Sequence, residues 1–180
     1  MPSATVIPMP QNYLLVIGDA AALAWVLSEE RMAFSSLRRS QAMSLEIGDE
    51  LLIYTTRGCF HNPGRDASRV MGLASATTQV RDLAEPVVFG ERRFTSGCAL
   101  AIKGVAALRQ GVELRSLVTE LHVFPDLKTW SAQLRRPLVP LDEHDASVLK
   151  RHLTVLLEPL EDHLSSYLQI AKGREKGTER

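Results

Sequence analysis

A Gly-Asp turn followed by two strand-like segments is the feature that most constrains the fold of this chain. Gly48 and Asp49 precede an apolar run at residues 51–56, which becomes aromatic and polar at its far end. A second apolar segment, residues 70–76, follows a loop rich in Arg, Gly, His and Pro. Apolar runs of this length, bounded by turn residues, are typical of strands. The pattern indicates a small β-barrel that presents a pocket at one rim.

Other segments of the chain extend this interpretation. Residues 32–36 are expected to be irregular, and the strand that begins at residue 70 is expected to continue to Val80. Five or six short strands with short helices between them favour an α+β fold with a mixed, partly open barrel over a parallel α/β sheet. Further strands are predicted at residues 13–17, 87–89, 98–102, 112–115 and 138–141, and short helices at residues 20–27, 37–43 and 128–136.

The C-terminal part has a different pattern. Asp142 is a good N-cap for a helix, and leucines then recur at steps of three and four. Pro159 interrupts this stripe and should kink the helix or begin a second one. The stripe has two interpretations, packing against its own barrel or forming a homodimer contact. The dimer contact would use Leu153, Leu156, Leu160 and Leu164.

Composition excludes some classes of function. Lys+Arg and Asp+Glu are equal at 21 each, so no overall field draws the chain to a polyanion, and any such affinity must come from a local patch. No apolar run approaches the roughly 20 residues that span a bilayer, so no membrane partner is expected. The two cysteines lack metal-type or redox-type spacing, which favours reduced thiols and a cytoplasmic location.

The rim of the expected pocket contains the residue types that bind a nucleobase. An aromatic ring stacks on the base, and Ser, Thr and Arg bind its edge. Arg57, Arg65 and Arg69 are candidates to hold flanking phosphates. The alternative is an ordinary solvated loop with Tyr54 in the core. Trp25 and Trp130 are each expected to be core anchors before pocket residues. The rim candidates are Phe34, Ser35, Ser36, Arg38, Tyr54, Thr55, Thr56 and Arg57.

Catalytic and metal-binding patterns are not expected. The five histidines never fall at the i, i+4 spacing of a zinc helix, and capping explains the carboxylates beside His144. No nucleophile, base and orienting group can be assembled, and no Gly-rich phosphate loop is present. The sequence therefore predicts neither an enzyme nor a metal or cofactor.

Four segments, in their order and spacing, resemble the EVE branch of the PUA-like superfamily. They are residues 12–15 (NYLL), 43–54, 71–75 (MGLAS) and 124–138. The resemblance spans roughly residues 12–153. It implies a pseudo-barrel of the kind found in intracellular readers of modified RNA and DNA bases, which are not enzymes by themselves. The pocket residues that it implies are Phe34, Ser35, Ser36, Tyr54, Thr55, Thr56 and Trp130.

Together these expectations describe a PUA-like mixed pseudo-barrel that reads a modified base, in DNA or RNA, without catalysis. Two alternatives stay open, a domain for a free nucleotide or small molecule, and an interaction subunit that associates through the leucine stripe. The expected organisation is an extended arm (1–11), the domain (12–153), a C-terminal helical extension (154–172) and a charged, disordered tail (173–180).

Overall fold

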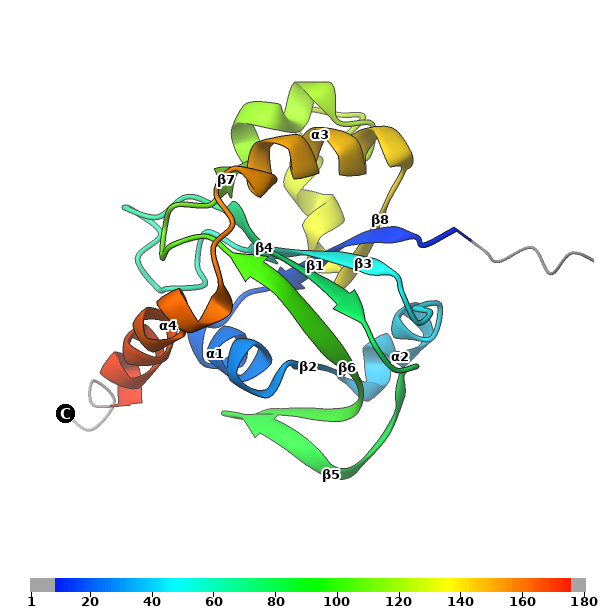
Figure 1. Ribbon diagram of the computed structural model, residues 1–180, viewed down its shortest axis with the longest axis vertical. Coiled ribbons are helices and arrows are strands. Elements are labelled where there is room, and N and C mark those ends of the chain that lie inside the picture. Colours follow the sequence, from blue (N-terminus) through cyan, green and yellow to red (C-terminus); the bar gives the residue numbers. More distant parts are fainter. Residues whose placement is uncertain (1–8, 176–180) are drawn as a thin grey trace, which may run out of the picture.

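A curled, mixed β-sheet with helices on both faces forms the centre of the protein (Figure 1). The computed structural model describes residues 9–175, so most of the predicted arm and tail lie outside the described residues. The strands are β1 (Asn12–Ile17), β2 (Arg31–Phe34), β3 (Glu50–Thr55), β4 (Arg69–Ala76), β5 (Arg81–Phe89), β6 (Arg92–Val105), β7 (Val112–Glu113) and β8 (Leu138–Leu141). The helices are α1 (Ala20–Glu29), η1 (Ser36–Arg38), α2 (Arg39–Ala42), η2 (Leu114–Glu120), η3 (Trp130–Arg135), α3 (Glu143–Thr154) and α4 (Leu160–Glu175), where η marks a 3₁₀-helix.

The sheet has the strand order β2-β6-β4-β3-β1-β8, with β5 added beside β6 and β7 beside β4. The β1–β3 pair is parallel and the other pairs are antiparallel. This confirms the predicted α+β class with a mixed, barrel-like sheet. The proline-containing strand β8 lies at the edge, as expected from its missing backbone donor.

The central strands are apolar without interruption because they separate two hydrophobic cores. Alternate side chains of a strand point to opposite faces. Tyr13 and Leu15 therefore belong to a first core, which also contains α1 and part of α4, whereas Leu14 belongs to a second core with α3, η2 and η3. In β3, Ile53 faces the first core and Tyr54 the second.

The Gly48-Asp49 turn joins three parts of the sheet. Gly48 adopts a φ of +92°, a left-handed conformation that glycine tolerates without strain. The buried carboxylate of Asp49 accepts hydrogen bonds from the backbone N–H groups of Gln11 and Glu46, both at 2.8 Å. The Gly48 N–H donates to the carbonyl of Ala76 at 2.8 Å. The turn thus aligns the beginnings of β1 and β3 with the end of β4.

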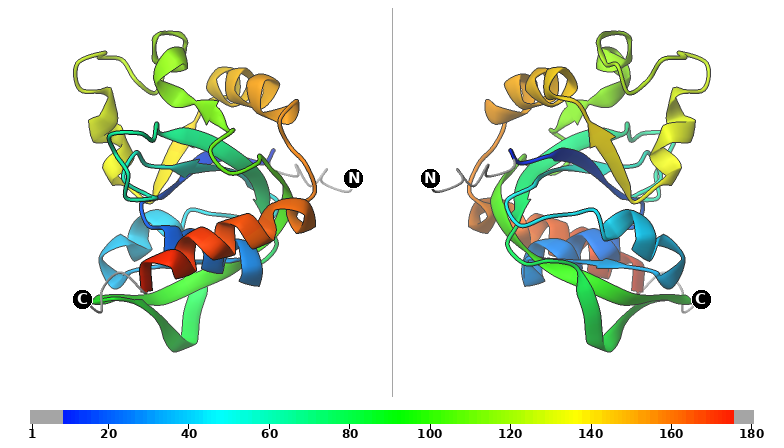
Figure 2. Two further views of the ribbon diagram at one scale, coloured as in Figure 1. Left: turned by 90° about the vertical axis from the view of Figure 1, so that its left-hand side faces the viewer. Right: turned by 90° about the vertical axis from the view of Figure 1, so that its right-hand side faces the viewer.

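The helix α1 begins as predicted, at the N-cap residue Asp19. Its carboxylate accepts hydrogen bonds from the N–H groups of Ala21 and Ala22, at 2.8 and 3.2 Å. The C-terminal helix α4 lies alongside α1 (Figure 2). Tyr167 of α4 is buried in the first core and donates a hydrogen bond to the carbonyl of Ala106 at 2.7 Å. This contact holds α4 against the barrel of its own chain.

The leucine stripe is divided between the two cores. Leu153 is buried in the second core, and Leu160 and Leu164 pack against the first core. Leu156 is the exposed member, at 37%. Pro159 separates α3 from α4, as the sequence predicted. The homodimer contact stays a prediction, although three of its four leucines contact their own chain.

Some predicted boundaries are wrong. Residues 32–36 are not irregular throughout, because β2 pairs with β6 from Arg31↔Ala99 to Phe34↔Ser96. The partner strand carries Gly97, and a Cβ at this position would lie 2.3 Å from the Met32 carbonyl oxygen. This close approach of two backbones depends on a partner about 65 residues away, so residues 31–34 alone do not reveal the strand.

Five other elements differ in length or type. The strand β4 ends at Ala76 and does not reach Val80, whereas β5 and β6 are longer than predicted. The segment that precedes Pro137 is a 3₁₀-helix, and residues 114–120, expected to begin as strand, also form one. No helix among the described residues is both long enough and apolar enough to cross a membrane.

Candidate functional site

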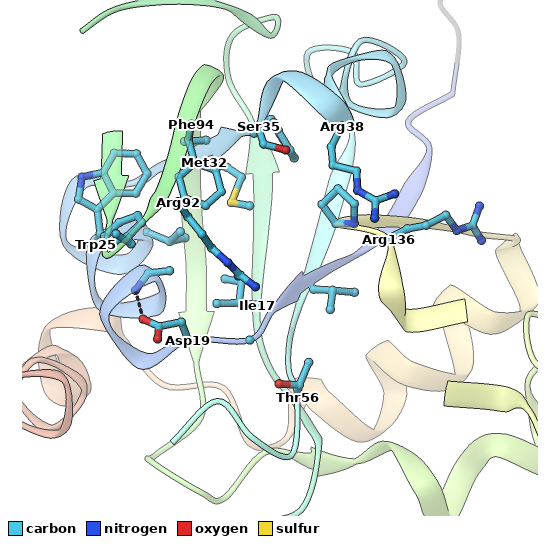
Figure 3. Close-up of a pocket in the computed structure, with 18 of the residues that line it drawn as sticks. Ile17, Asp19, Trp25, Met32, Ser35, Arg38, Thr56, Arg92, Phe94 and Arg136 are labelled. Atoms are coloured by element: carbon cyan, nitrogen blue, oxygen red, sulfur yellow. Dashed lines mark hydrogen bonds between the residues drawn. The ribbon is translucent and has the colours of Figure 1, made fainter. Parts of the chain in front are cut away.

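A cavity of about 480 Å³ opens where the end of β1, the helix α1 and the strand β2 meet the β5–β6 hairpin (Figure 3). The segment that follows η3 closes the opposite side, with Arg136 and Pro137. The cavity is therefore built from elements at the start, middle and end of the domain. We call it the arginine-lined cavity.

One wall of the arginine-lined cavity is aromatic. Trp25 of α1 and Phe89 of β5 meet edge to face, with ring centroids 6.0 Å apart. Phe89 contacts Phe94 of β6 in the same manner, with centroids 5.8 Å apart. The guanidinium of Arg31 lies 5.8 Å from the centroid of the Trp25 ring. These half-buried rings form an apolar surface that faces partly to solvent.

The remainder of the wall is strongly basic. Among the described residues, the lining contains five arginines and one acid. Arg136 donates a hydrogen bond to the Gln133 side chain at 3.1 Å. The other four guanidinium groups form no ion pair or hydrogen bond within the described part of the chain. A group of unpaired cations around an aromatic wall is suited to an anionic, flat ligand. The five arginines are Arg38, Arg92, Arg93, Arg135 and Arg136.

The one acid in the lining, Asp19, is engaged elsewhere. Its carboxylate caps α1, and it lies 3.6 Å from Nε2 of His61. Asp19 therefore complements the positive end of the helix.

The β5–β6 hairpin places two functional groups together. Gly90 has a φ of +59° in the turn, and Phe89 pairs directly with Arg92. Arg92 and Phe94 are two residues apart on β6, so both side chains project from one face of the strand. Figure 3 shows Phe94 beside Met32 and the Arg92 side chain reaching across the cavity towards Ile17. The hairpin thus supplies both an apolar surface and a cation.

The structure brings four of the predicted site residues to the cavity. Ser35, Arg38 and Thr56 line it with side chains that are at least partly exposed. Phe34 also lines it but is 1% exposed, so its ring lies beneath the wall and belongs to the first core.

Tyr54 is not one of the lining residues. It is 2% exposed and belongs to the second core, on the opposite face of the sheet from Phe34. Burial raises the pKa of the Tyr54 hydroxyl, and a hydrogen bond with Ser68 opposes this effect. Because its ring is enclosed by the core, Tyr54 does not offer a stacking surface at the cavity.

The other predicted residues also lie outside the cavity lining. Thr55 is buried and donates to the Arg69 carbonyl at 3.3 Å, and Ser36 is exposed. Trp130 packs edge to face on Phe124 in the second core, with ring centroids 5.6 Å apart. Trp130 is half-buried, packs against the second core and is not among the residues that line the cavity.

The loop between β3 and β4 holds most of its arginines internally. Arg57 donates to the Pro63 carbonyl at 2.5 Å, and Arg69 donates to the Gly111 carbonyl at 2.9 Å. Among the three arginines proposed to hold phosphates, only Arg65 has no such bond within the described residues. The basic charge at the cavity comes instead from the β5–β6 hairpin and from residues 135–136.

Sequence reasoning missed the main aromatic residue of the site. Trp25 was expected in the core because it lies on an Ala-rich helix; it does pack against the first core, but it is half-buried and also lines the cavity. A usable signal was the run Phe-Gly-Glu-Arg-Arg-Phe at residues 89–94, in which two aromatic and two basic residues flank a tight turn. Such a combination at a hairpin end favours binding over core packing.

Comparison with known proteins supports the fold. No protein-family model and no curated protein matches the sequence. Among solved structures, the Mmi1 YTH domain in complex with RNA has a TM-score of 0.56 at 8% identity, over 81% of this chain and 79% of that one. The human THYN1 protein in complex with 5-methylcytosine-containing DNA has a TM-score of 0.50 at 12% identity, over 79% and 97%. A hypothetical protein from Leishmania major has a TM-score of 0.50 at 12% identity, over 79% and 93%.

These similarities extend over most of each chain, although the sequence identities are only 8–12%. They agree with the curled mixed sheet and with the position of its helices. The chain therefore has a PUA-like fold related to those of the EVE and YTH domains.

Proposed function

We propose that the protein is a non-catalytic binding module that reads a modified base in nucleic acid with its arginine-lined cavity. The observation that carries this proposal is that an aromatic wall, Trp25 with Phe89 and Phe94, adjoins four arginines that have no ion pair or hydrogen bond to any described residue. A nucleotide is complementary to both features, because it has a flat face that can stack on the rings and a negative charge that the arginines attract.

The dimensions of the cavity support one base as the ligand. Small-molecule pockets commonly have volumes of about 300–1,000 Å³, and this cavity of about 480 Å³ lies within that range. An extruded base loses a few kcal/mol of stacking within its strand. Stacking on an aromatic side chain returns about 1–3 kcal/mol per base, so the aromatic wall offsets this loss.

The arginines then have two roles. Arg92 extends across the cavity, where its planar guanidinium suits the edge of a base. Arg93 and Arg135 are exposed at the rim and are placed to bind the phosphates on either side of the extruded base. Because the net charge of the chain is zero, this local group supplies the attraction that the whole chain lacks.

The ligands of the structural neighbours agree with this proposal. Human THYN1 was solved with DNA that contains 5-methylcytosine, and the Mmi1 YTH domain with RNA. Both are binding domains with the fold of this chain. They leave open whether the strand read here is DNA or RNA, so the test must include both.

A matched panel of short oligonucleotides tests the proposal. Each DNA or RNA strand carries one base in its unmodified, methylated or hydroxymethylated form, and affinity is measured by fluorescence anisotropy. We expect one modified base to be preferred by about tenfold or more, which corresponds to about 1.4 kcal/mol. Equal, weak binding to every strand would overturn the proposal. Tighter binding of a free nucleoside than of the strand that contains it would favour a small-molecule domain.

A further inference from the structure

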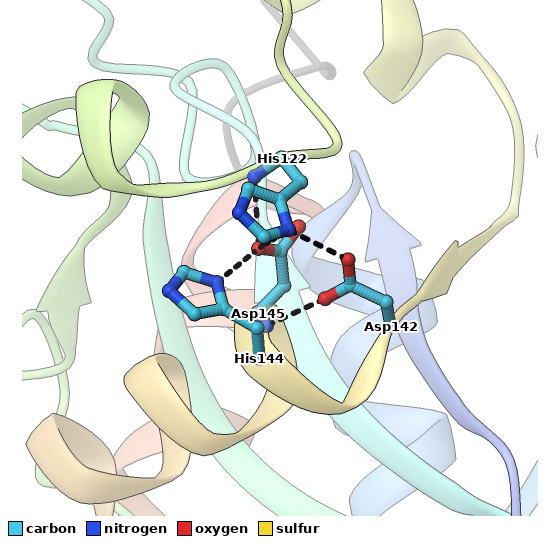
Figure 4. Close-up of side chains that lie close together, drawn as sticks. All are labelled: His122, Asp142, His144 and Asp145. Atoms are coloured by element: carbon cyan, nitrogen blue, oxygen red, sulfur yellow. Dashed lines mark hydrogen bonds and ion pairs between the residues drawn. The ribbon is translucent and has the colours of Figure 1, made fainter.

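Two histidines and two aspartates converge at the N-terminal end of α3, on the second-core side of the sheet (Figure 4). His122 comes from the segment after η2, whereas Asp142, His144 and Asp145 belong to the N-cap and first turn of α3. We call these four residues the His–Asp cluster. They share no residue with the arginine-lined cavity, so the nucleic-acid proposal does not account for them.

The donor atoms of the His–Asp cluster lie close together. Nδ1 of His122 is 2.8 Å from Oδ2 of Asp142 and 3.9 Å from Oδ1 of Asp145. Nδ1 of His144 is 3.1 Å from the same oxygen of Asp145. One donor atom from each residue lies within 4.8 Å of all the others. In a tetrahedral zinc site with bonds of about 2.0–2.1 Å, the ligand atoms are about 3.3–3.4 Å apart, so these separations bracket the required value.

The two imidazoles are arranged for one shared cation. Their rings stack with centroids 4.1 Å apart and an interplanar angle of 14°, and the same ring nitrogen of each faces the carboxylates. A dication held between these two nitrogens would lie beside both carboxylates.

The surroundings hold these donors in place. The side chain of Asp145 is 1% exposed, and it accepts hydrogen bonds from the backbone N–H groups of His122 and Val123, each at 2.8 Å. Asp142 accepts a hydrogen bond from the Asp145 N–H at 2.8 Å. Hydrogen bonds to ligating carboxylates are the outer-shell contacts that orient metal ligands in proteins.

Capping alone accounts for the carboxylates but not for the histidines. Asp142 is the N-cap of α3, and Asp145 anchors the segment after η2. Neither role requires imidazoles, yet Nδ1 of His122 contacts Asp142 at 2.8 Å and Nδ1 of His144 contacts Asp145 at 3.1 Å. Both side chains are accessible, at 64% and 48% exposure, so an ion can enter from solvent.

We propose that His122, Asp142, His144 and Asp145 bind one divalent late transition metal ion, with Zn²⁺ the preferred ion. Two imidazoles and two carboxylates form a donor set that suits zinc better than Ca²⁺ or Mg²⁺, which select oxygen. The ion would cross-link the segment after η2 to the start of α3 and so stabilise the packing of these two helices in the second core. This inference departs from the sequence prediction, which expected no metal.

Metal stoichiometry and affinity test the site. The chain is stripped with a chelator, dialysed against Zn²⁺ and assayed by elemental analysis, and the zinc affinity is measured by competition with a chromophoric chelator. We expect one zinc ion per chain and a higher melting temperature in its presence. Co²⁺ in place of zinc should give the visible absorption of a tetrahedral site.

Matched histidine variants distinguish this site from adventitious binding. His122→Gln and His144→Gln should each lower the zinc affinity by about tenfold or more. His152→Gln removes an exposed histidine from the same helix and should leave the affinity unchanged. Circular dichroism confirms that each variant is folded. Absence of bound zinc, or equal loss of zinc affinity in all three variants, would overturn the inference. Neither result bears on nucleic-acid binding.

Discussion

Trp25 and Phe89 meet edge to face, with ring centroids 6.0 Å apart and planes inclined at 73°. This contact joins the helix α1 to the β5–β6 hairpin. Because Phe89 pairs with Arg92 across the hairpin, the contact also sets the position of a cavity arginine relative to the indole. The position of the aromatic wall and the position of Arg92 therefore depend on each other.

Replacement of Trp25 should weaken binding without unfolding the protein. Trp25→Ala removes the largest ring of the wall, and loss of a stacking platform costs about 1–3 kcal/mol, so the affinity should fall by about tenfold or more. Trp25→Phe keeps an aromatic ring and should lose less. Affinity is measured by anisotropy, and a thermal melt establishes that each variant is folded.

Trp130→Phe is the matched control. Trp130 packs against the second core and does not line the cavity, so this variant should bind as the wild type does. Weak binding by Trp130→Phe together with normal binding by Trp25→Ala would contradict this account. It would favour the pocket implied by the sequence resemblance, which includes Trp130.

The hairpin arginines should determine how binding depends on salt. Each phosphate contact contributes about −0.9 to the slope of log affinity against log salt for a duplex, and about −0.7 for a single strand. Because Arg93 is proposed to bind a phosphate and Arg92 the base edge, the double variant Arg92→Gln/Arg93→Gln should reduce the slope by about 0.7–0.9. The same variant should also lower the preference for the modified base, and an unchanged preference would contradict the role of Arg92.

Arg115→Gln controls for the loss of charge in this measurement. Arg115 is exposed on η2, away from the cavity lining. The change in the salt slope is divided by the number of charges removed, one in this control and two in the double variant. Equal values would show that the hairpin arginines contact the nucleic acid no more than a distant arginine does.

Glu50 should make the protein sensitive to acid. Burial acts to raise the pKa of Glu50, but hydrogen bonds and charges from Lys150 and Lys103 outweigh it and hold the pKa below the ordinary value of 4.5. A lowered pKa contributes stability above that ordinary value, and the contribution is lost as the pH falls through the folded-state pKa. Glu50→Gln should therefore lower the melting temperature at neutral pH, by about 2–4 °C.

The difference between wild type and Glu50→Gln should shrink as the pH falls below 4.5. Thermal melts across this range measure it. A constant difference at every pH would show that the ion pairs of Glu50 do not contribute to stability.

The two cysteines should be unreactive in the folded protein. Cys59 is fully buried, and burial raises the pKa of Cys98 from 9.0 to about 11. The thiolate is the reactive form, so a raised pKa suppresses reaction. Ellman's reagent at about pH 8 should detect no thiol in the native state and both after denaturation. Rapid native reaction that disappears in Cys98→Ser would contradict the burial of that residue.

The sequence identified the elements whose signals are local. Asp19 and Asp142 cap their helices as predicted, because a capping side chain contacts only the next few residues. Pro159 separates α3 from α4 for an equally local reason. The strands β1, β3 and β4 were recognised from apolar runs between turn residues.

What the sequence could not show depends on contacts between distant segments. The strand β2 forms because the backbone of β6 can approach it closely at Gly97. Tyr54 and Phe34 lie in different cores, on opposite faces of the sheet, although each is near the end of its strand. The cavity likewise requires Trp25, the β5–β6 hairpin and residues 134–137 to meet. The spacing of these segments in the sequence does not predict that they lie side by side.

The fluorescence of Trp25 tests the central proposal most directly. In a Trp130→Phe variant, Trp25 is the one tryptophan of the chain and reports on the arginine-lined cavity. It is titrated with two oligonucleotides that differ only in the modification of one base, and anisotropy is followed in parallel. We predict saturable quenching of Trp25 at the concentration at which the modified strand binds, and weaker quenching with the unmodified strand. Binding of both strands with no change in Trp25 emission would contradict the proposal that a base enters this cavity.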